Sequence, residues 1–476
     1  MKRDVNRRLA GGAWRSGPFG IALVLLQTVL HCLVAQLAWS TPADTAKSGQ
    51  DKPGQDGFWA PVKDTRLGPF ALAFSGQLRM RYESSDGFTL KGYQPGGADE
   101  LLLERLRMEV ALRFLDKPRL FLQLQDAHAF LTTFDDGDFP QSNPIENTLD
   151  VRQLYLEWLH IGETPFGFKV GRQQISYGDQ RVFGPGNWGN TGRFAWDAAM
   201  FKIDADQFWM DLWVGRFLQY KSAIWPDRSV SDFLTFVTYT GIKKLPFSLE
   251  LFYVNTRDDR AVVAGETGNG NIRSQSVGVQ STWQEQNSMD AGVTFVAQFG
   301  RYAADRIRAY GANAKWGTFI SAPGRPRLGV QFTYGSGDRD PADGVHETFD
   351  GVFGGRDIQY YGFLNLFFWA NLRDYQFELS VWPHEDAVVQ FEYHHFTLDR
   401  ARDAWYTTGL VPYRRDRAGH SGLSLGEELD MRATWNLQGH LELMGRYGVF
   451  FPGSFVSQTG ASTKAHWFFA QAAYSW

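Results

Sequence analysis

The last stretch of the chain, from His466 to Trp476, constrains the fold more than any other segment. Every second residue counted back from the carboxyl end is apolar: Trp476, Tyr474, Ala472, Ala470 and Phe468. The residues between them are mostly small or polar. This period of two predicts a strand with one apolar and one polar face. Such a strand fits a membrane barrel, with lipid outside and water inside, or the last strand of a soluble β-sandwich.

The connections between alternating segments favour the barrel over the sandwich. Segments of this kind recur about every 20 to 25 residues, as in 70–83, 102–114, 328–334, 375–381, 429–435 and 441–451. Short connections are 116–118, 243–246, 383–386 and 438–440, and long ones are 84–99, 130–147, 178–194, 256–271, 399–426 and 452–463. Short periplasmic turns and long extracellular loops are typical of outer-membrane barrels. We therefore expect an all-β, transmembrane antiparallel β-barrel.

The expected number of strands is about 18, within a range of 16–18, because a closed bacterial barrel needs an even number. Counting segments gives 17 to 19, so one segment is misassigned. The weakest pair is Tyr360–Trp369 and Asn371–Trp382, which almost no turn separates. The preceding segment, 336–357, fits a long loop on either rim.

The two ends of the chain predict its cellular location. Residues 1–40 combine a basic start, an apolar run and small residues near position 40, as in a secretory signal peptide, with a retained signal anchor as the alternative. A Gly-, Pro- and charge-rich leader follows over 41–65, and the barrel is expected over 66–476. The aromatic residues Phe468, Tyr474 and Trp476 resemble the assembly signal of bacterial outer-membrane proteins. This resemblance implies the Gram-negative outer membrane and its barrel assembly machinery.

Charge and cysteine content exclude several classes of function. Cys32 is the only cysteine and lies in the predicted signal peptide, so the mature chain would have no thiol for a disulfide or metal. Without residues 1–40 the chain has 43 basic and 51 acidic residues, which gives no reason to expect a nucleic-acid partner. Among the basic residues, Arg outnumbers Lys 31 to 12.

Charged residues in the alternating segments are expected to face the lumen, because their apolar neighbours face lipid. The predicted lumen residues are Arg79, Arg81, Arg105, Arg107, Glu109, Arg113, Asp430, Arg432 and Arg446. Arginine binds carboxylates through two parallel hydrogen bonds and keeps its charge. These residues therefore predict a path for anions, with an inert ladder of salt bridges as the alternative.

Two motifs resemble the alginate export family of outer-membrane porins. The first spans 170–184 and continues to Asp197; the second spans 361–374 and is followed by 393–396 and 403–406. The resemblance implies an 18-stranded barrel with an electropositive constriction closed by inward-folded loops. It implies export of an alginate-like anionic polysaccharide, with a periplasmic polysaccharide-export scaffold as a partner. By motif, Arg172, Asp179, Arg181 and Arg193 would lie at or near the constriction.

Other patterns carry less weight. Asp338, Asp340 and Asp343 could supply oxygens to Ca²⁺, but a solvated loop is the better interpretation. His394 and His395 are adjacent in a predicted strand, so they point to opposite faces and cannot bind a metal as a pair. The loop 184–192 fits a compact structure anchored by Trp188. No cofactor is implied, and no serine, histidine and acid spacing indicates an enzyme. Uptake of small anions or acidic oligosaccharides, and a non-transporting barrel, remain alternative functions.

Overall fold

The computed structural model describes residues 65–476, apart from 116, 140–141, 267, 286–287 and 356. The predicted signal peptide, 1–40, and all but the last residue of the predicted leader, 41–65, lie outside the described residues. No helix of the described part is long and apolar enough to cross a membrane.

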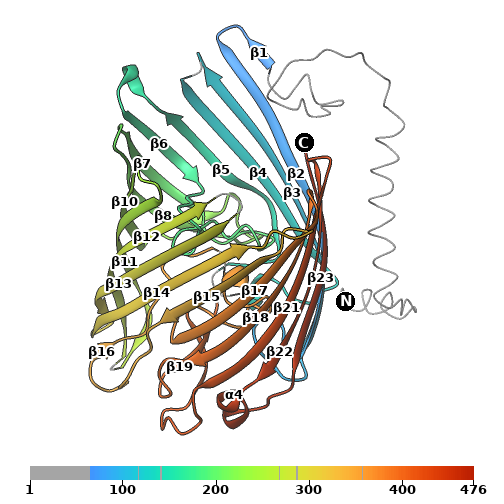
Figure 1. Ribbon diagram of the computed structural model, residues 1–476. Helices are drawn as coiled ribbons and strands as arrows, with labels where there is room; N and C mark the ends of the chain where they lie inside the picture. Colours follow the sequence, from blue (N-terminus) through green and yellow to red (C-terminus); the bar gives the residue numbers. More distant parts are fainter. Residues whose placement is uncertain (1–64, 116, 140–141, 267, 286–287, 356) are drawn as a thin grey trace, which may run out of the picture. The chain divides into compact units, whose positions relative to one another are not determined.

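Eighteen antiparallel strands form a closed barrel, as the alternation predicted (Figure 1). Each wall strand pairs with its neighbours in sequence, and the last one returns to the first. The wall strands are β2 (Phe70–Asp86), β3 (Ala98–Phe114), β4 (Pro118–Phe130), β5 (Asn147–Trp158), β6 (Phe166–Gln173), β7 (Trp196–Asp204), β8 (Phe208–Gln219), β10 (Phe233–Ile242), β11 (Ser248–Gly265), β12 (Gly268–Glu285), β13 (Met289–Tyr302), β14 (Asp305–Phe319), β15 (Arg327–Gly335), β17 (Leu372–His384), β18 (Ala387–Leu398), β21 (Ser424–Leu437), β22 (Leu441–Pro452) and β23 (Ala465–Ser475).

The terminal strand closes the barrel. Strand β23 pairs with β2 from Gln77 opposite Ser475 to Asp86 opposite His466. Beyond that register, the backbones of Gly76 and Trp476 exchange two hydrogen bonds, of 3.2 and 3.1 Å. A Cβ atom at Gly76 would lie 2.3 Å from the Trp476 ring, so the ring packs where only glycine leaves room. The last residue of the chain therefore belongs to the closing seam.

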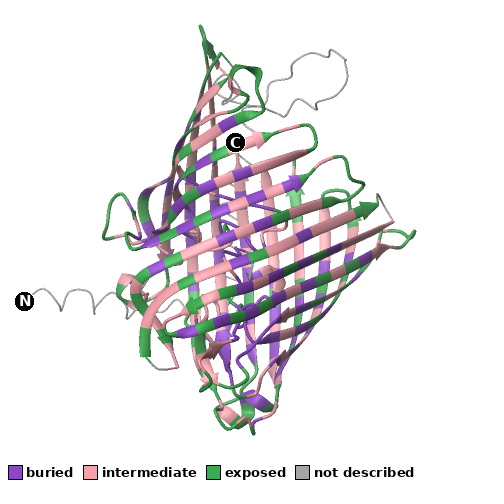
Figure 2. Ribbon diagram, turned by 90° about the vertical axis from the view of Figure 1, so that its left-hand side faces the viewer, coloured by how far each residue is buried: buried purple, intermediate pink, exposed green. Residues whose placement is uncertain are grey.

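The two faces of the wall alternate in the expected sense, which appears as banding along the strands in Figure 2. Apolar outward side chains such as Phe377 and Phe468 are 57% and 40% exposed. The inward neighbour Phe469 is fully buried, and Gln471 is 9% exposed. Exposed apolar side chains on the outer face are the surface that lipid covers in a membrane barrel.

The two rims differ as predicted. Short turns lie at the rim near the C-terminus, whereas β16, β19 and α4 mark the rim with the long loops (Figure 1). The expected loop 256–271 is wrong: β11 and β12 extend through most of it and pair with a bulge between Asp258 and Val263. The smaller elements are β1 (Thr65–Leu67), β9 (Arg228–Ser229), β16 (Val345–His346), β19 (Ala404–Thr407), β20 (Val411–Arg415), 3-10 helices at Asp136–Asp138 and Ile161–Glu163, α3 (Asp357–Tyr360) and α4 (Ser454–Thr459).

The ambiguous pair of segments is resolved in favour of the second. Leu372–His384 forms β17, whereas 361–371 contains no strand. Its apolar side chains, including Phe363, Phe367 and Trp369, are buried in the largest apolar cluster of the described residues. The segment 336–371 is thus a loop from the long-loop rim, and it meets another long loop, 174–195, inside the barrel.

Candidate functional site

Strands β2 and β3 carry four buried arginines on the inner face of the wall. Arg79 and Arg81 lie on β2, and Arg105 and Arg107 lie on β3; each is 8% exposed or less. Arg79 stands directly opposite Arg105 in the register. Like charges in this arrangement destabilise a sheet unless other groups compensate. The wall therefore needs acceptors from elsewhere in the chain.

Backbone carbonyls of the loop 174–195 supply these acceptors. Arg79 donates to the carbonyl oxygens of Asn187 and Trp188, at 3.3 and 3.2 Å. Arg105 donates to the Asn187 oxygen at 2.9 Å, and Arg81 donates to the Trp188 oxygen at 2.9 Å. The turn at Asn187 and Trp188 is thus held by three arginines through neutral oxygens.

Carboxylates take little part in this wall. Arg81 forms an ion pair with Glu83 at 2.7 Å. Glu109 instead accepts hydrogen bonds from Ser75, at 2.9 Å, and from Gln123. Among the described residues, no recorded ion pair joins the other three arginines to a carboxylate. A ladder of salt bridges therefore does not describe this surface.

Trp188 anchors the tip of the loop between two cations. The guanidinium carbons of Arg81 and Arg446 lie 4.3 and 4.4 Å from the centre of its ring. Phe469 of β23 packs beside the ring, with the two centroids 4.9 Å apart. Contacts between a cation and an aromatic face are attractive because the ring carries negative charge on its faces.

Arg446 has hydrogen-bond donors that no acceptor among the described residues uses. Its three guanidinium nitrogens are buried and have no hydrogen-bond partner among the described residues. It contacts the rings of Trp188 and Phe363, the latter also at 4.4 Å. Arg432, its neighbour across β21 and β22, donates to Gln390. Buried arginine nitrogens without acceptors are costly, and the cost falls when an anion reaches them.

The two inward loops are joined to each other. The amide of Gly184 donates to the Phe353 oxygen at 3.0 Å, and the Phe353 amide donates to the Val182 oxygen at 2.9 Å. Arg193 of the first loop donates to the carbonyl of Gly354 in the second, at 3.1 Å. The loops therefore form one structure that crosses the lumen.

Arg181 is the centre of this junction. It donates to the Tyr361 hydroxyl at 3.2 Å, and its guanidinium carbon lies 3.9 Å from the centre of the Tyr360 ring. Asp179 accepts from the Arg181 amide at 3.1 Å and lies 3.4 Å from the Lys315 ammonium group. Burial raises the pKa of Asp179, but Arg181 and Lys315 outweigh it and hold the pKa below its usual value. Asp179 and Arg181 thus lie at the junction of the two loops, and their place at the constriction stays a prediction.

A second wall of the lumen is acidic and holds the other loop. Glu428 of β21 accepts a hydrogen bond from the Leu364 amide at 2.9 Å, and Asp430 accepts one from the Phe363 amide at 3.3 Å. Gly362 has a φ of +84°, and a Cβ atom there would lie 2.6 Å from the Glu428 carboxylate. Glycine therefore allows this close approach. The arginines hold one loop by its carbonyls, and the carboxylates hold the other by its amides.

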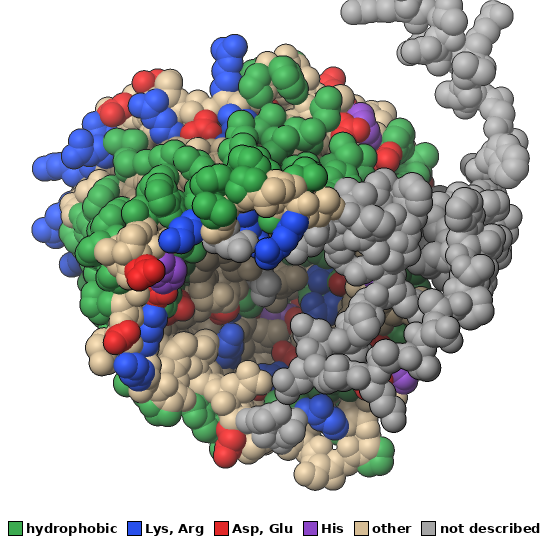
Figure 3. All heavy atoms as spheres, turned by 90° about the horizontal axis from the view of Figure 1, so that it is seen from above, with side chains coloured by type: hydrophobic (Ala, Val, Ile, Leu, Met, Phe, Trp, Pro, Cys, Tyr) green, Lys and Arg blue, Asp and Glu red, His purple; other side chains and the backbone are tan. Residues whose placement is uncertain are grey.

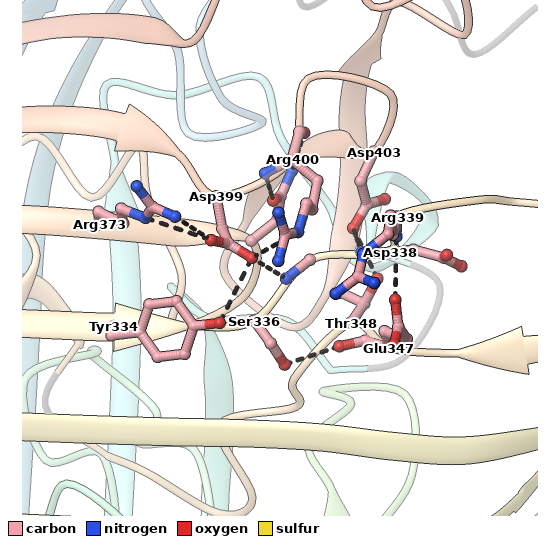
Figure 4. Close-up of polar contacts among 12 residues, drawn as sticks. Tyr334, Ser336, Asp338, Arg339, Glu347, Thr348, Arg373, Asp399, Arg400 and Asp403 are labelled. Carbon is pink, nitrogen blue, oxygen red and sulfur yellow. Dashed lines mark hydrogen bonds and ion pairs between the residues drawn. The ribbon is translucent and has the colours of Figure 1, made fainter.

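The base of the second loop is fixed by a polar network with the loop 399–423 (Figure 4). Asp399 pairs with Arg373 at 2.6 Å and accepts from the Gly337 amide at 3.2 Å. Asp403 accepts from the Asp338 amide at 2.9 Å and from the Thr348 hydroxyl at 2.6 Å.

The lumen is hollowed at the rim with short turns, and a cavity lies beside the joined loops. Figure 3, seen from the rim with short turns, shows basic and acidic side chains on the wall of the opening. This cavity has a volume of about 1140 Å³. Residues of both inward loops line it, together with residues near the rim with the long loops. Its lining combines aromatic residues such as Phe194 and Tyr302 with charged ones such as Arg193, Asp305 and Arg415.

Two other predicted lumen residues lie apart from this junction. Arg113 shares the inward face of β3 but is exposed near its end. Arg172 is on the face of exposed Val170, opposite Leu154 and Asp197 in the register, and bonds Asp197 at 2.9 Å. The register of β6, whose alternation continues through Gly171, does not support the predicted lumen position of Arg172.

The suggested calcium site is not assembled. Asp340 and Asp343 are exposed, whereas Asp338 is buried. Burial, followed by Asp403 and Glu266, raises the pKa of Asp338 to about 7. In the described part of the chain, the one group of three acidic or histidine side chains with converging ligand atoms lies elsewhere, at Glu392, His394 and Asp430.

Sequence inspection missed part of the acidic wall. The sequence analysis did not assign Glu392, His394 and Glu428 to the lumen. Glu428 lies two residues before Asp430 on β21, and Glu392 and His394 are likewise two residues apart on β18. This period of two was the available signal. As expected, His394 and His395 point to opposite faces: His394 is buried, and 38% of the His395 side chain is exposed.

Comparison with known proteins agrees with this architecture. The family model for alginate export matches residues 70–470. No curated protein matches the chain. The crystal structure of Pseudomonas aeruginosa OpdQ is similar over 85% of this chain and 98% of that one, with a TM-score of 0.56 and 10% identity. The crystal structure of Acinetobacter baumannii OccAB2 has the same coverage and TM-score at 12% identity, which reflects a shared fold. This chain belongs to the alginate export family and is an outer-membrane β-barrel channel.

Proposed function

We propose that this channel passes an alginate-like anionic polysaccharide from the periplasm to the exterior along the wall formed by β2, β3, β21 and β22. The observation that carries the proposal is the contact between Arg79, Arg81 and Arg105 and the carbonyls at Asn187 and Trp188. These carbonyls occupy arginine nitrogens that a carboxylate could take.

A carboxylate is a better partner for this wall than the loop is. A carboxylate carries the charge opposite to that of arginine and accepts two parallel hydrogen bonds from its guanidinium group, whereas a carbonyl oxygen is neutral. A chain of uronate residues offers one carboxylate per sugar, so it could replace the loop carbonyls along the wall. Arg446, whose nitrogens lack acceptors among the described residues, would gain partners rather than exchange them.

Passage of a polysaccharide requires the joined loops to move. Their contacts with the wall are hydrogen bonds, ring contacts and ion pairs such as that between Asp179 and Lys315, all of which water or substrate can replace. The acidic wall repels an anion and so limits how tightly it binds, which favours release. The family's name supports the outward direction, and a periplasmic scaffold would deliver the polymer.

The test is single-channel current in a planar bilayer with uronate oligosaccharides, compared with neutral oligosaccharides of equal length. We expect the acidic set to block the current and the neutral set to leave it unchanged. The variant Arg105→Glu/Arg107→Glu should lose at least tenfold in blocking affinity and should shift ion selectivity towards cations.

The matched control is Arg273→Glu, which reverses a charge on the outer face of β12, where Arg273 pairs with Asp259. This control should keep the wild-type block. Equal block by neutral oligosaccharides would contradict the proposal. Passage of small anions without block by oligouronates would instead support a porin for the uptake of small anions.

A further inference from the structure

The acidic wall contains a compact cluster that the transport path does not explain. Glu392 and His394 lie on β18, opposite Asp430 and Glu428 of β21, respectively. Asp374 lies on the adjacent strand β17. All five side chains are 5% exposed or less. Among the described residues, no recorded ion pair joins Lys or Arg to any of the four carboxylates.

The imidazole ring of His394 is oriented by one carboxylate and faces two others. Its Nδ1 lies 3.0 and 3.1 Å from the two carboxylate oxygens of Asp374. Its Nε2 lies 3.4 Å from Glu392 and 4.0 Å from Asp430. When Nδ1 donates to Asp374, the lone pair of Nε2 points towards two more carboxylates. This arrangement is repulsive unless a proton on Nε2 or a bound cation lies between them.

Two oxygens of the cluster have no partner. One carboxylate oxygen of Glu428, Oε2, and one of Asp430, Oδ1, are buried without a hydrogen bond among the described residues. A buried carboxylate oxygen without a donor is costly, and proteins normally satisfy it with a donor or a bound cation. These two oxygens leave room for a donor or a bound cation beside the contact between His394 and Asp430, which involves the other Asp430 oxygen, Oδ2.

We propose that Glu392, His394 and Asp430 bind a divalent transition-metal ion of the zinc class. One ligand atom from each lies within 4.8 Å of the others. Ligand atoms about 2.0 Å from a tetrahedral zinc ion are about 3.3 Å apart, so small rotations of these side chains complete the site.

The donor set selects the class of ion. A neutral imidazole with carboxylates suits zinc and related ions, whereas calcium and magnesium prefer oxygen ligands alone. Metal-binding histidines usually donate their other ring N–H to a carboxylate, and Asp374 holds that position. Glu428 stands beside the three ligands and offers a further oxygen.

The ion would also act on the loop that crosses the lumen. Asp430 and Glu428 accept the amides of Phe363 and Leu364, so the ligand set and the loop anchor share residues. The ion would hold these carboxylates in a fixed orientation and so stabilise the loop.

The test is direct metal binding to the full-length protein, purified in detergent without a histidine tag and stripped with a chelator. We expect about one equivalent of zinc in a competition titration, with calcium and magnesium failing to compete at tenfold excess. His394→Ala and Asp430→Asn should each weaken zinc binding by at least tenfold.

The matched control is His395→Ala, which removes the adjacent histidine from the opposite face of the same strand and should bind zinc as the wild type does. Heat-modifiable migration in gels will confirm that each variant is a folded barrel. If His394→Ala does not fold, Glu392→Gln provides the same comparison. Absence of zinc binding to the wild type would overturn the proposal, as would unchanged binding in the variants or equal affinity for calcium. Binding is measured without transport, so the outcome is independent of the proposed function.

Discussion

Replacing Trp188 with alanine tests whether the joined loops close the channel. The ring lies between Arg81 and Arg446 and contacts Phe469 and Trp467, with centroids 4.9 and 6.1 Å apart. The substitution removes these contacts but keeps the backbone carbonyl that accepts from Arg81. It therefore weakens the anchor of the loop without altering the charge of the wall.

The expected size of the effect follows from these contacts. A cation over an aromatic face contributes about 0.5–2 kcal/mol, and an aromatic pair about 0.5–1.5 kcal/mol. Two cation contacts and two aromatic pairs, less the free energy recovered when water refills the site, together contribute about 3 kcal/mol. At about 1.4 kcal/mol per tenfold change, the equilibrium between closed and open channel should shift towards the open form by about 100-fold.

The assay is the open probability of single channels in a planar bilayer at fixed voltage. The control is Trp225→Ala, which removes a tryptophan that is 66% exposed in the segment before β9. This control should behave as the wild type. An unchanged open probability in Trp188→Ala, with the barrel folded, would refute the role of the ring as the anchor of a closed state.

Two further predictions concern the seam and the loop base. Deleting Trp476 removes the two backbone hydrogen bonds to Gly76, so we expect a smaller fraction of heat-modifiable, folded barrel; normal assembly would contradict a role in closure. Burial next to Asp403 and Glu266 raises the pKa of Asp338 to about 7, above its unfolded value of about 4. The stabilisation that Asp338 gives to the base of the loop is therefore complete below about pH 4, where its carboxyl is protonated, and is lost as the pH rises through 7. Limited proteolysis of the loop 336–371 should be slower at pH 5 than at pH 8. The variant Asp338→Asn should reduce this difference. If the variant keeps the same pH dependence, groups other than Asp338 cause it.

Much of the wall could be predicted because alternation is a local property. The stripe from Phe468 to Trp476 identified the lipid face, and the same period placed Arg79, Arg105 and Arg446 inside. The period failed where the chain leaves the wall. Residues 360–369 are apolar enough for a strand, yet they are buried in the loop that crosses the lumen. Composition alone does not distinguish burial against lipid from burial against protein.

The sequence by itself determined the closed antiparallel barrel, its two rims and the arginine-rich inner face, since each follows from residues near one another in the chain. Only the tertiary structure decided which loops enter the lumen and what holds them there. It brought the carbonyl groups at 187–189 to the arginines, and the amides at 363–364 to Glu428 and Asp430. It also gathered Asp374, Glu392, His394 and Asp430 from three strands into one cluster. These contacts join residues far apart in sequence, and their partners include backbone groups that every residue carries, so no sequence pattern identifies them.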